Sequence, residues 1–330
     1  MGSDVIALPS LDFLWGKQEQ VILEAVYTQP DRARGRGKKV QANAIKNWAL
    51  EKGIPVYQPE QFDEVAIQDL AQLNADVILV MAYGHLLPQA VIDLPRLGIY
   101  NIHTSLLPEL RGASPVETAV ASGFEESGVT LMQLIMKMDA GPICDQERIS
   151  IGEDDTGGSC RESLAQASPL LLERQLTAML EGSLEPEEQK EEDVSYCRLL
   201  VKQDGQLDFS QPAKTLAHRI NGLFPWPGCS AEIGGMMLKI GLAHYEDSDC
   251  DAPPGTVLEA GADGIHVATG KGVLQLLQLQ RPGGKMLPVD AFLLGFSIAS
   301  GSTFTSREMH PLISAKPVSH KRVFQLYTKP

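Results

Sequence analysis

Short apolar runs alternate with helix-like segments through the first half of this chain. That alternation is typical of a parallel sheet whose strands are joined by crossover helices. We expect strands at 21–28, 54–57, 77–82, 98–103 and 129–135. We expect helices at 41–52, 62–73, 115–122 and 155–180. The first half therefore predicts an α/β domain with a parallel-sheet core.

The sequence changes character after an acidic run. Residues 181–193 hold seven acidic residues and one lysine, together with Pro186, which indicates a solvated linker. Beyond it, short strands broken by glycine and proline predict a small β-barrel with a helix at 213–221. Those strands are expected at 231–233, 236–243, 255–258, 264–268 and 272–279. The predicted domains are 1–182 (catalytic), 183–199 (acidic linker), 200–305 (barrel) and 306–330 (weakly basic tail, either touching RNA or disordered).

The start of the chain lacks the first strand that such a sheet needs. Residues 1–4 match the turn that follows that strand, and residues 7–11 match the helix after the turn. Five or six buried apolar side chains at ~1.5–3 kcal/mol each are worth ~10 kcal/mol, which is comparable to the stability of a domain. We therefore expect Met1 to be an internal methionine of a longer protein, with a Val/Ile/Phe-rich strand upstream.

Two polar residues stand where one predicted strand ends. Asn101 and His103 follow the apolar run 97–100 and lie two positions apart, so both side chains project from one face of the strand. An Asn amide can donate to a developing oxyanion, and a His can carry a proton near neutral pH. Asp139, in the segment 138–141, could hold and charge that His. The pattern indicates transfer of a small acyl group to an amine.

The stretch 101–141 resembles the 10-formyltetrahydrofolate-dependent formyltransferases. Three distant stretches agree with the members that act on initiator methionyl-tRNA, and the likeness runs from about Gly2 to about Phe304. The stretches are Thr28-Gln29-Pro30-Asp31-Arg32 with Gly35-Arg36-Gly37-Lys38-Lys39, Phe224-Pro225-Trp226-Pro227-Gly228, and Pro254-Gly255-Thr256-Val257 with Asp263-Gly264 and Ala268-Thr269-Gly270. The resemblance implies a Rossmann-like formyltransferase domain followed by an OB-like barrel.

The resemblance also implies roles for particular residues. Asn101 would stabilise the tetrahedral intermediate, while Asp139 would orient or charge His103. His103 is either a general base or a cationic electrophile, because a close His–Asp pair can titrate as a unit. The folate would be bound by a proline-containing loop and by a second segment that walls the pterin pocket. These folate residues are Ser105, Leu106, Leu107, Pro108, Gly84, Leu86 and Leu87.

A cluster of basic residues stands out in an acidic chain. Five positive charges fall within eight residues, whereas the whole chain has a formal charge of −14. Flanking glycines predict a mobile loop, and the resemblance implies that it contacts the tRNA acceptor stem, with Arg36 as the main contact. The basic residues are Arg32, Arg34, Arg36, Lys38 and Lys39. Negative charge over the rest of the surface predicts that any RNA contact is local.

Composition bears on the surroundings in which the protein works. The longest apolar run, 77–82, is far shorter than the ~20 residues of a membrane span. An odd number of cysteines without a C-x-x-C pair predicts reduced thiols in the cytoplasm and no metal. We expect a monomer that uses 10-formyltetrahydrofolate as co-substrate.

Alternatives stay open at this point. One is a related formyltransferase or hydrolase acting on a small amine, a nucleotide sugar or water, and the other is a non-catalytic relative that binds folate or tRNA. The basic loop disfavours the first alternative. The presence of Asn101, His103 and Asp139 disfavours the second.

Overall fold

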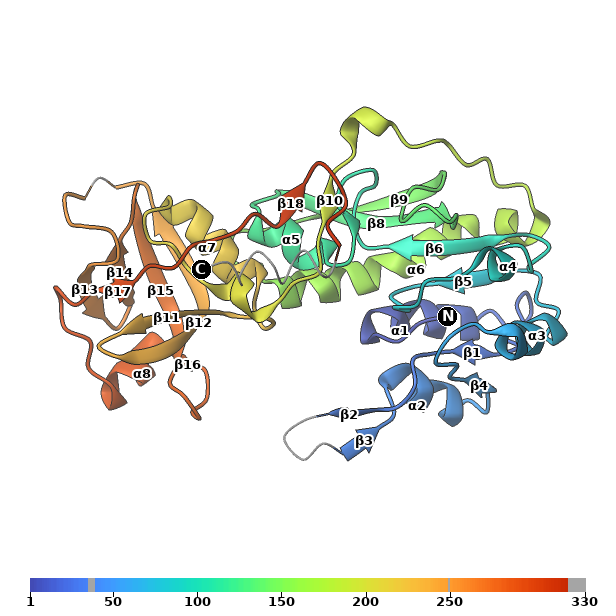
Figure 1. The fold of residues 1–330 in the computed structure, drawn as a ribbon, viewed down its shortest axis with the longest axis horizontal. Coiled ribbons are helices and arrows are strands. Elements are labelled where there is room, and N and C mark those ends of the chain that lie inside the picture. Colours follow the sequence, from blue (N-terminus) through green and yellow to red (C-terminus); the bar gives the residue numbers. More distant parts are fainter. Residues whose placement is uncertain (35–38, 249, 320–330) are drawn as a thin grey trace. The chain divides into compact units, whose positions relative to one another are not determined.

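The computed structural model describes residues 1–34, 39–248 and 250–319, and it divides into two compact units (Figure 1). The first unit comprises Met1–Arg111, Gly128–Ile149 and Glu162–Val194, and the second comprises Gly112–Ser127, Ser150–Arg161 and Ser195–Pro330. Each unit therefore draws on separate stretches of chain. The predicted domain boundaries at 182 and 199 stay a prediction.

Parallel strands form the core of the first unit. β1 (Val26–Tyr27) pairs in parallel with β4 (Val56–Tyr57), and β5 (Ile78–Val80) pairs in parallel with β6 (Ile99–His103). This confirms the predicted parallel core. The sheet then continues with β8 (Glu126–Gln133), which runs antiparallel to β6, and with β9 (Ile143–Ser150) beside β8.

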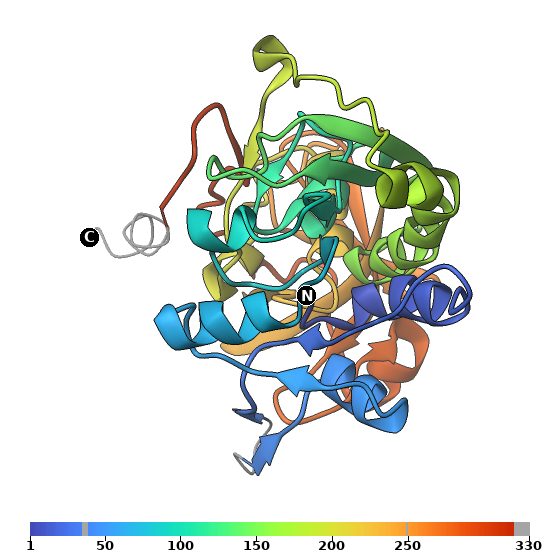
Figure 2. The same ribbon diagram turned by 90° about the vertical axis from the view of Figure 1, so that its right-hand side faces the viewer.

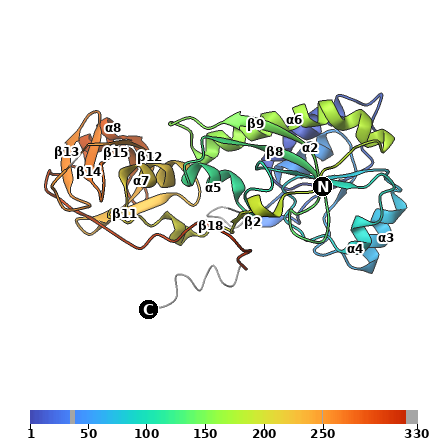
Figure 3. The same cartoon turned by 90° about the horizontal axis from the view of Figure 1, so that it is seen from above.

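Helices cover this core on both sides. Figure 2 faces this unit and shows α3 (Glu64–Gln72) on one side of the β1–β4 pair, with α1 (Leu8–Trp15) and α2 (Ala44–Glu51) on the other. The capped ends explain where two of them begin, because Asn43 accepts from the Lys46 amide and Asp63 accepts from the Ala66 amide. The remaining helical segments are η1 (Val5–Ala7), α4 (Gln89–Ile92), η2 (Glu191–Asp193) and the long α6 (Gly157–Glu181). α6 runs beside β9 (Figure 3).

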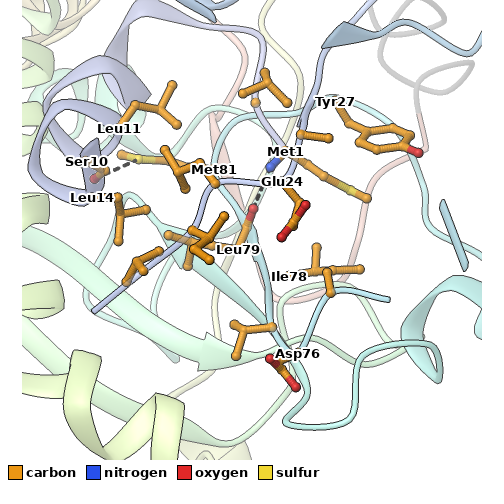
Figure 4. Close-up of a pocket in the computed structure, with 18 of the residues that line it drawn as sticks. Met1, Ser10, Leu11, Leu14, Glu24, Tyr27, Asp76, Ile78, Leu79 and Met81 are labelled. Carbon is orange, nitrogen blue, oxygen red and sulfur yellow. Dashed lines mark hydrogen bonds between the residues drawn. The ribbon is translucent and has the colours of Figure 1, made fainter. Parts of the chain in front are cut away.

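A cavity of roughly 360 Å³ separates β1 from β5 (Figure 4). The start of the chain bridges the two sides at one end of the cavity, since the Gly2 amide donates to Tyr27 O at 3.0 Å and the Met81 amide donates to Met1 O at 2.9 Å. The stretch 21–25 lines the cavity and is not part of β1, so the predicted strand 21–28 is shortened to its last residues. The cavity lies between β1 and β5, at the position that a central strand of the sheet would occupy.

The second unit contains a curled antiparallel sheet, which confirms the predicted barrel (Figure 3). Its strand order is β13-β14-β15-β12-β11-β17, with β16 on β15. An antiparallel bridge between Thr256 and Thr303 joins the two ends of that order and closes the barrel. The strands are β11 (Cys229–Ile233), β12 (Met236–Glu246), β13 (Val257–Gly261), β14 (Gly264–Ala268), β15 (Val273–Gln280), β16 (Leu287–Pro288) and β17 (Phe304–Thr305).

Helices pack with this barrel. α7 (Ala213–Gly222) buries Leu216 and Ile220 in the same apolar core as Leu276 of β15. The predicted helix at 213–221 is therefore confirmed. The unit also contains α5 (Pro115–Ala121), α8 (Val289–Gly295) and η3 (Lys202–Gly205).

The described part of the tail is folded. Residues of β18 (Ile313–Ser314) pair with β10 (Tyr196–Cys197), and Leu312 is buried in the barrel core. The role of the tail stays a prediction, and 320–330 lie outside the described residues. In the parts of the chain that the structure describes, no helix is both long and apolar enough to span a bilayer.

Candidate active site

His103 is held between two partners in the first unit. Its side chain is buried, and its Nε2 lies 3.0 Å from the carbonyl oxygen of Leu110. A carbonyl oxygen only accepts hydrogen bonds, so Nε2 carries the hydrogen of the neutral ring. The other ring nitrogen, Nδ1, lies 3.8 Å from Asp139 Oδ1. The structure thus brings together the predicted His–Asp pair and leaves Nδ1 as the nitrogen that can exchange a proton.

Asn101 lies on the same strand face as His103. β6 extends through both residues, and its pairing with β8 places Asn101 opposite Met132 and His103 opposite Thr130. Strand geometry therefore projects both side chains to one face, as the sequence predicts. The Asn101 side chain is partly exposed, and its amide has no hydrogen-bond partner among the residues that the structure describes. That amide can donate to a ligand.

Backbone strain marks both segments that contact His103. Leu110 has a φ of 56° and Asp139 has a φ of 47°, in the left-handed region that disfavours side chains with a Cβ. Such residues cost about 1–3 kcal/mol each and persist only where their surroundings hold them. Strained residues cluster at functional sites, so their position next to His103 supports this region as the active site.

The loop between His103 and Leu110 is fastened by side chains that the sequence did not single out. Thr130 Oγ1 donates to Ser105 O at 2.6 Å and accepts from the Leu107 amide at 3.1 Å. Gln146 Nε2 donates to Leu107 O at 2.9 Å. These contacts fix the loop that carries the Leu110 carbonyl. Thr130 and Gln146 lie on neighbouring strands, β8 and β9, so only the folded sheet reveals them.

The predicted folate residues divide by exposure. Ser105, Leu106, Leu107 and Leu87 are buried, and Ser105 Oγ donates to Glu109 O at 2.6 Å. Leu86 is 88% exposed, Gly84 is exposed, and Pro108 is partly exposed. Gly84 has a φ of 78°, which a residue without Cβ adopts at little cost. Folate contact by either group stays a prediction, and the exposed residues are the ones that a ligand can reach.

Three of the predicted tRNA residues, Arg32, Arg34 and Lys39, lie on two paired strands. β2 (Arg32–Arg34) pairs antiparallel with β3 (Lys39–Gln41). The Arg32 side chain is 58% exposed and forms an ion pair with Glu60 at 2.9 Å. Arg36 and Lys38 lie outside the described residues, and for Arg34 and Lys39 only the backbone is described. The tRNA contacts therefore stay predictions.

Across residues 1–34, 39–248 and 250–319, no group of three or more His, Cys, Asp or Glu side chains could hold a metal ion. The cysteines of the described chain are free, and burial raises the pKa of Cys160 to about 12 and that of Cys144 to about 11. The reactive thiolate form of either residue is therefore disfavoured near neutral pH.

Comparison with known proteins identifies relatives over most of the chain. The family description "Formyl transferase" matches residues 11–176, and "Formyl transferase, C-terminal domain" matches residues 199–297. The methionyl-tRNA formyltransferase of Burkholderia thailandensis is 41% identical over 290 residues, which cover 85% of this chain and 88% of that protein. The methionyl-tRNA formyltransferase of Caldanaerobacter subterraneus subsp. tengcongensis is 38% identical over 304 residues, which cover 92% of this chain and 97% of that protein.

Solved structures show the same fold at low sequence identity. An N-formyltransferase from Helicobacter canadensis, in complex with folinic acid and dTDP-3-aminofucose, superimposes with a TM-score of 0.63 at 16% identity. The match covers 83% of this chain and 97% of that one. Both family descriptions and the sequence relatives agree with this fold. The chain belongs to the formyl transferase family.

Proposed function

We propose that this enzyme transfers the formyl group of 10-formyltetrahydrofolate to the amino group of methionine on initiator methionyl-tRNA. The observation that carries the proposal is the buried His103, fixed by the Leu110 carbonyl on one side and facing Asp139 on the other, on the strand that also presents Asn101. The names of the sequence relatives support this acceptor. The folinic acid in the Helicobacter canadensis structure supports a folate as the formyl donor.

The chemistry needs one hydrogen-bond donor and one proton carrier. The methionyl amine attacks the formyl carbon, and a tetrahedral intermediate with a negative oxygen forms. The Asn101 amide donates to that oxygen, which stabilises the transition state where charge develops. Collapse breaks the bond between the formyl carbon and N10, and N10 takes up a proton while the new amide forms.

His103 Nδ1 is the site of proton exchange in this scheme. Because Nε2 donates to the Leu110 carbonyl, Nδ1 is free of hydrogen in the neutral ring and can accept the proton that the attacking amine loses. Asp139 then stabilises the charged ring from 3.8 Å. The same proton is returned to the departing N10, so atoms and charge balance over the reaction.

The two substrates would approach from parts of the first unit that are accessible. Gly84, Leu86 and Pro108 offer exposed or partly exposed surface for the folate, and Arg32 on β2 offers an exposed basic side chain for the RNA. Apolar side chains can cover a pterin ring, and a basic side chain can contact phosphates. Both contacts are part of the proposal.

A transfer assay tests the proposed function. Purified enzyme is mixed with formyl-labelled 10-formyltetrahydrofolate and with charged initiator tRNA, charged elongator tRNA, a dTDP-amino sugar or buffer alone. We expect label in the initiator methionyl-tRNA and a loss of at least ~10²-fold with His103→Gln, which removes the proton carrier. Label in the amino sugar or in free formate instead would replace the proposed acceptor.

A further inference from the structure

One side chain of the acidic segment 183–193 points inward. The Gln189 side chain is buried, whereas its neighbours Glu188 and Lys190 are exposed. Its Nε2 donates to Asp139 O at 2.9 Å and to Gly141 O at 2.7 Å. Its Oε1 accepts from Arg111 Nε at 2.9 Å. Both amide hydrogens and the amide oxygen are thus in use, so the orientation of this amide is fixed.

These hydrogen bonds join the two segments that hold His103. Asp139 supplies the carboxylate that faces Nδ1, and Gln189 holds the backbone of that residue. Arg111 directly follows Leu110, whose carbonyl lies against Nε2. A single side chain therefore links the Asp139 turn to Arg111, the residue next to Leu110, whose carbonyl is the other partner of the imidazole.

Both linked segments are strained and need to be held. Leu110 and Asp139 adopt left-handed backbone conformations, and such conformations persist where neighbouring contacts fix them. Arg111 is fully buried and lies 3.5 Å from Glu191, two residues after Gln189. The segment that contains Gln189 and Glu191 thus contacts the Leu110 side of the site by two side chains.

The acidic segment is also attached by contacts that do not involve the Gln189 side chain. Two residues earlier, Glu187 forms a pair of backbone hydrogen bonds with Ile143, at 2.7 and 2.8 Å. That bridge fixes the segment to the start of β9. The hydrogen bonds of the Gln189 side chain instead hold the Asp139 turn and Arg111, which both lie next to the partners of His103.

We propose that Gln189 is a positioning residue that sets the distance and direction between Asp139 and His103. The proposal rests on the proposed function for its kinetic test. A displacement of about 1 Å at a catalytic group can cost ~10²-fold in rate. We therefore expect an effect on the transfer step and little effect on substrate affinity.

Gln189→Glu is the most specific substitution. It keeps the size of the side chain and an oxygen for Arg111, and it replaces the amide donor to Asp139 O and Gly141 O with an acceptor. We expect kcat to fall by ~10–100-fold while KM for either substrate changes less than about threefold. Glu188→Gln, on the exposed neighbour, is the matched control and should retain wild-type kinetics.

A double-mutant cycle separates positioning from general support of the fold. If Gln189 acts through Asp139, then Gln189→Glu should lower kcat by less than about twofold in an Asp139→Ala background. If the kcat losses caused by the Gln189 and Asp139 substitutions multiply in the double variant, the two residues act independently and the proposal is overturned. An unchanged kcat in a folded Gln189→Glu enzyme would overturn it as well. Gln189→Leu serves as the second variant if Gln189→Glu does not fold.

A spectroscopic readout keeps this test separate from the identity of the acceptor. The ring-nitrogen NMR shifts of His103, assigned with His103→Gln, should move in Gln189→Glu and stay constant in Glu188→Gln. This result would stand even if the enzyme formylated a different amine. Unmoved ring shifts in the folded Gln189→Glu protein would show that Gln189 does not position the pair.

Discussion

Replacing Asp139 by asparagine removes one charge and leaves the shape of the side chain nearly unchanged. In the structure Asp139 Oδ1 lies 3.8 Å from His103 Nδ1. At an effective dielectric constant of ~20, two unit charges about 4 Å apart attract by ~4 kcal/mol. The Asp139 side chain is 18% exposed, so water weakens that attraction. If the Asp139→Asn enzyme stabilises the charged His103 ring by ~3–4 kcal/mol less, transfer should be ~10²–10³-fold slower.

Single-turnover kinetics measure this loss directly. Enzyme in excess over labelled 10-formyltetrahydrofolate is mixed with charged initiator tRNA, and formyl-methionyl-tRNA is followed after rapid quenching. Folate affinity should remain near that of the wild type, because Asp139 acts on His103 in this scheme. Asp76→Asn, which removes an exposed carboxylate paired with Arg96, is the control. Transfer by Asp139→Asn within threefold of the wild type would refute the proposed role of the carboxylate.

Four further outcomes are expected. Arg36→Ala should weaken use of charged tRNA far more than folate binding and should lower the salt sensitivity of transfer; identical kinetics at every salt concentration would make the basic residues irrelevant to RNA. Arg198→Ala leaves Asp204 buried without the guanidinium that donates to it at 2.8 Å, so urea unfolding should show a loss of ~3–5 kcal/mol. Burial, and then a neighbouring carboxylate, raises the pKa of Cys144 to about 11, so alkylation followed by mass spectrometry should be slow at pH 8 and rise toward pH 11. Fusing an apolar strand of about five residues to Met1 should raise the melting temperature by filling the cavity between β1 and β5, whereas a Gly/Ser extension of equal length should not.

Local patterns predicted the parts of the site that lie on one strand. Asn101 and His103 are two positions apart in an apolar run, and the period of a strand is enough to place them on one face. The turn at Asp139 could be recognised from the resemblance to formyltransferases. The direction of β8 could not be predicted, since alternation of apolar residues is the same in parallel and antiparallel strands. β9 was missed because its sequence, Ile143–Ser150, is mostly polar and its side chains are partly exposed.

Contacts between segments that are far apart in the sequence could not be predicted from local sequence patterns. The Leu110 carbonyl contributes a backbone atom, and no residue type signals that a carbonyl will face an imidazole. Thr130 and Gln146 fasten the loop before Leu110 from neighbouring strands. Their role appears only once β8 and β9 lie side by side. Burial of Leu106 and Leu107 likewise follows from packing, because leucines after a strand can face either the core or a ligand.

The acidic segment shows why composition misleads at a functional site. Its charge predicts a solvated linker, and most of its side chains are exposed as expected. Gln189 is uncharged, so it can be buried at lower cost than the carboxylates around it, and its amide satisfies donors and acceptors at the same time. A carboxylate at this position could not donate to Asp139 O and Gly141 O, and an apolar residue would leave those oxygens and Arg111 without this partner. The one neutral polar side chain among the charged residues 187–193 is therefore the one whose chemistry matches the strained turn beside His103.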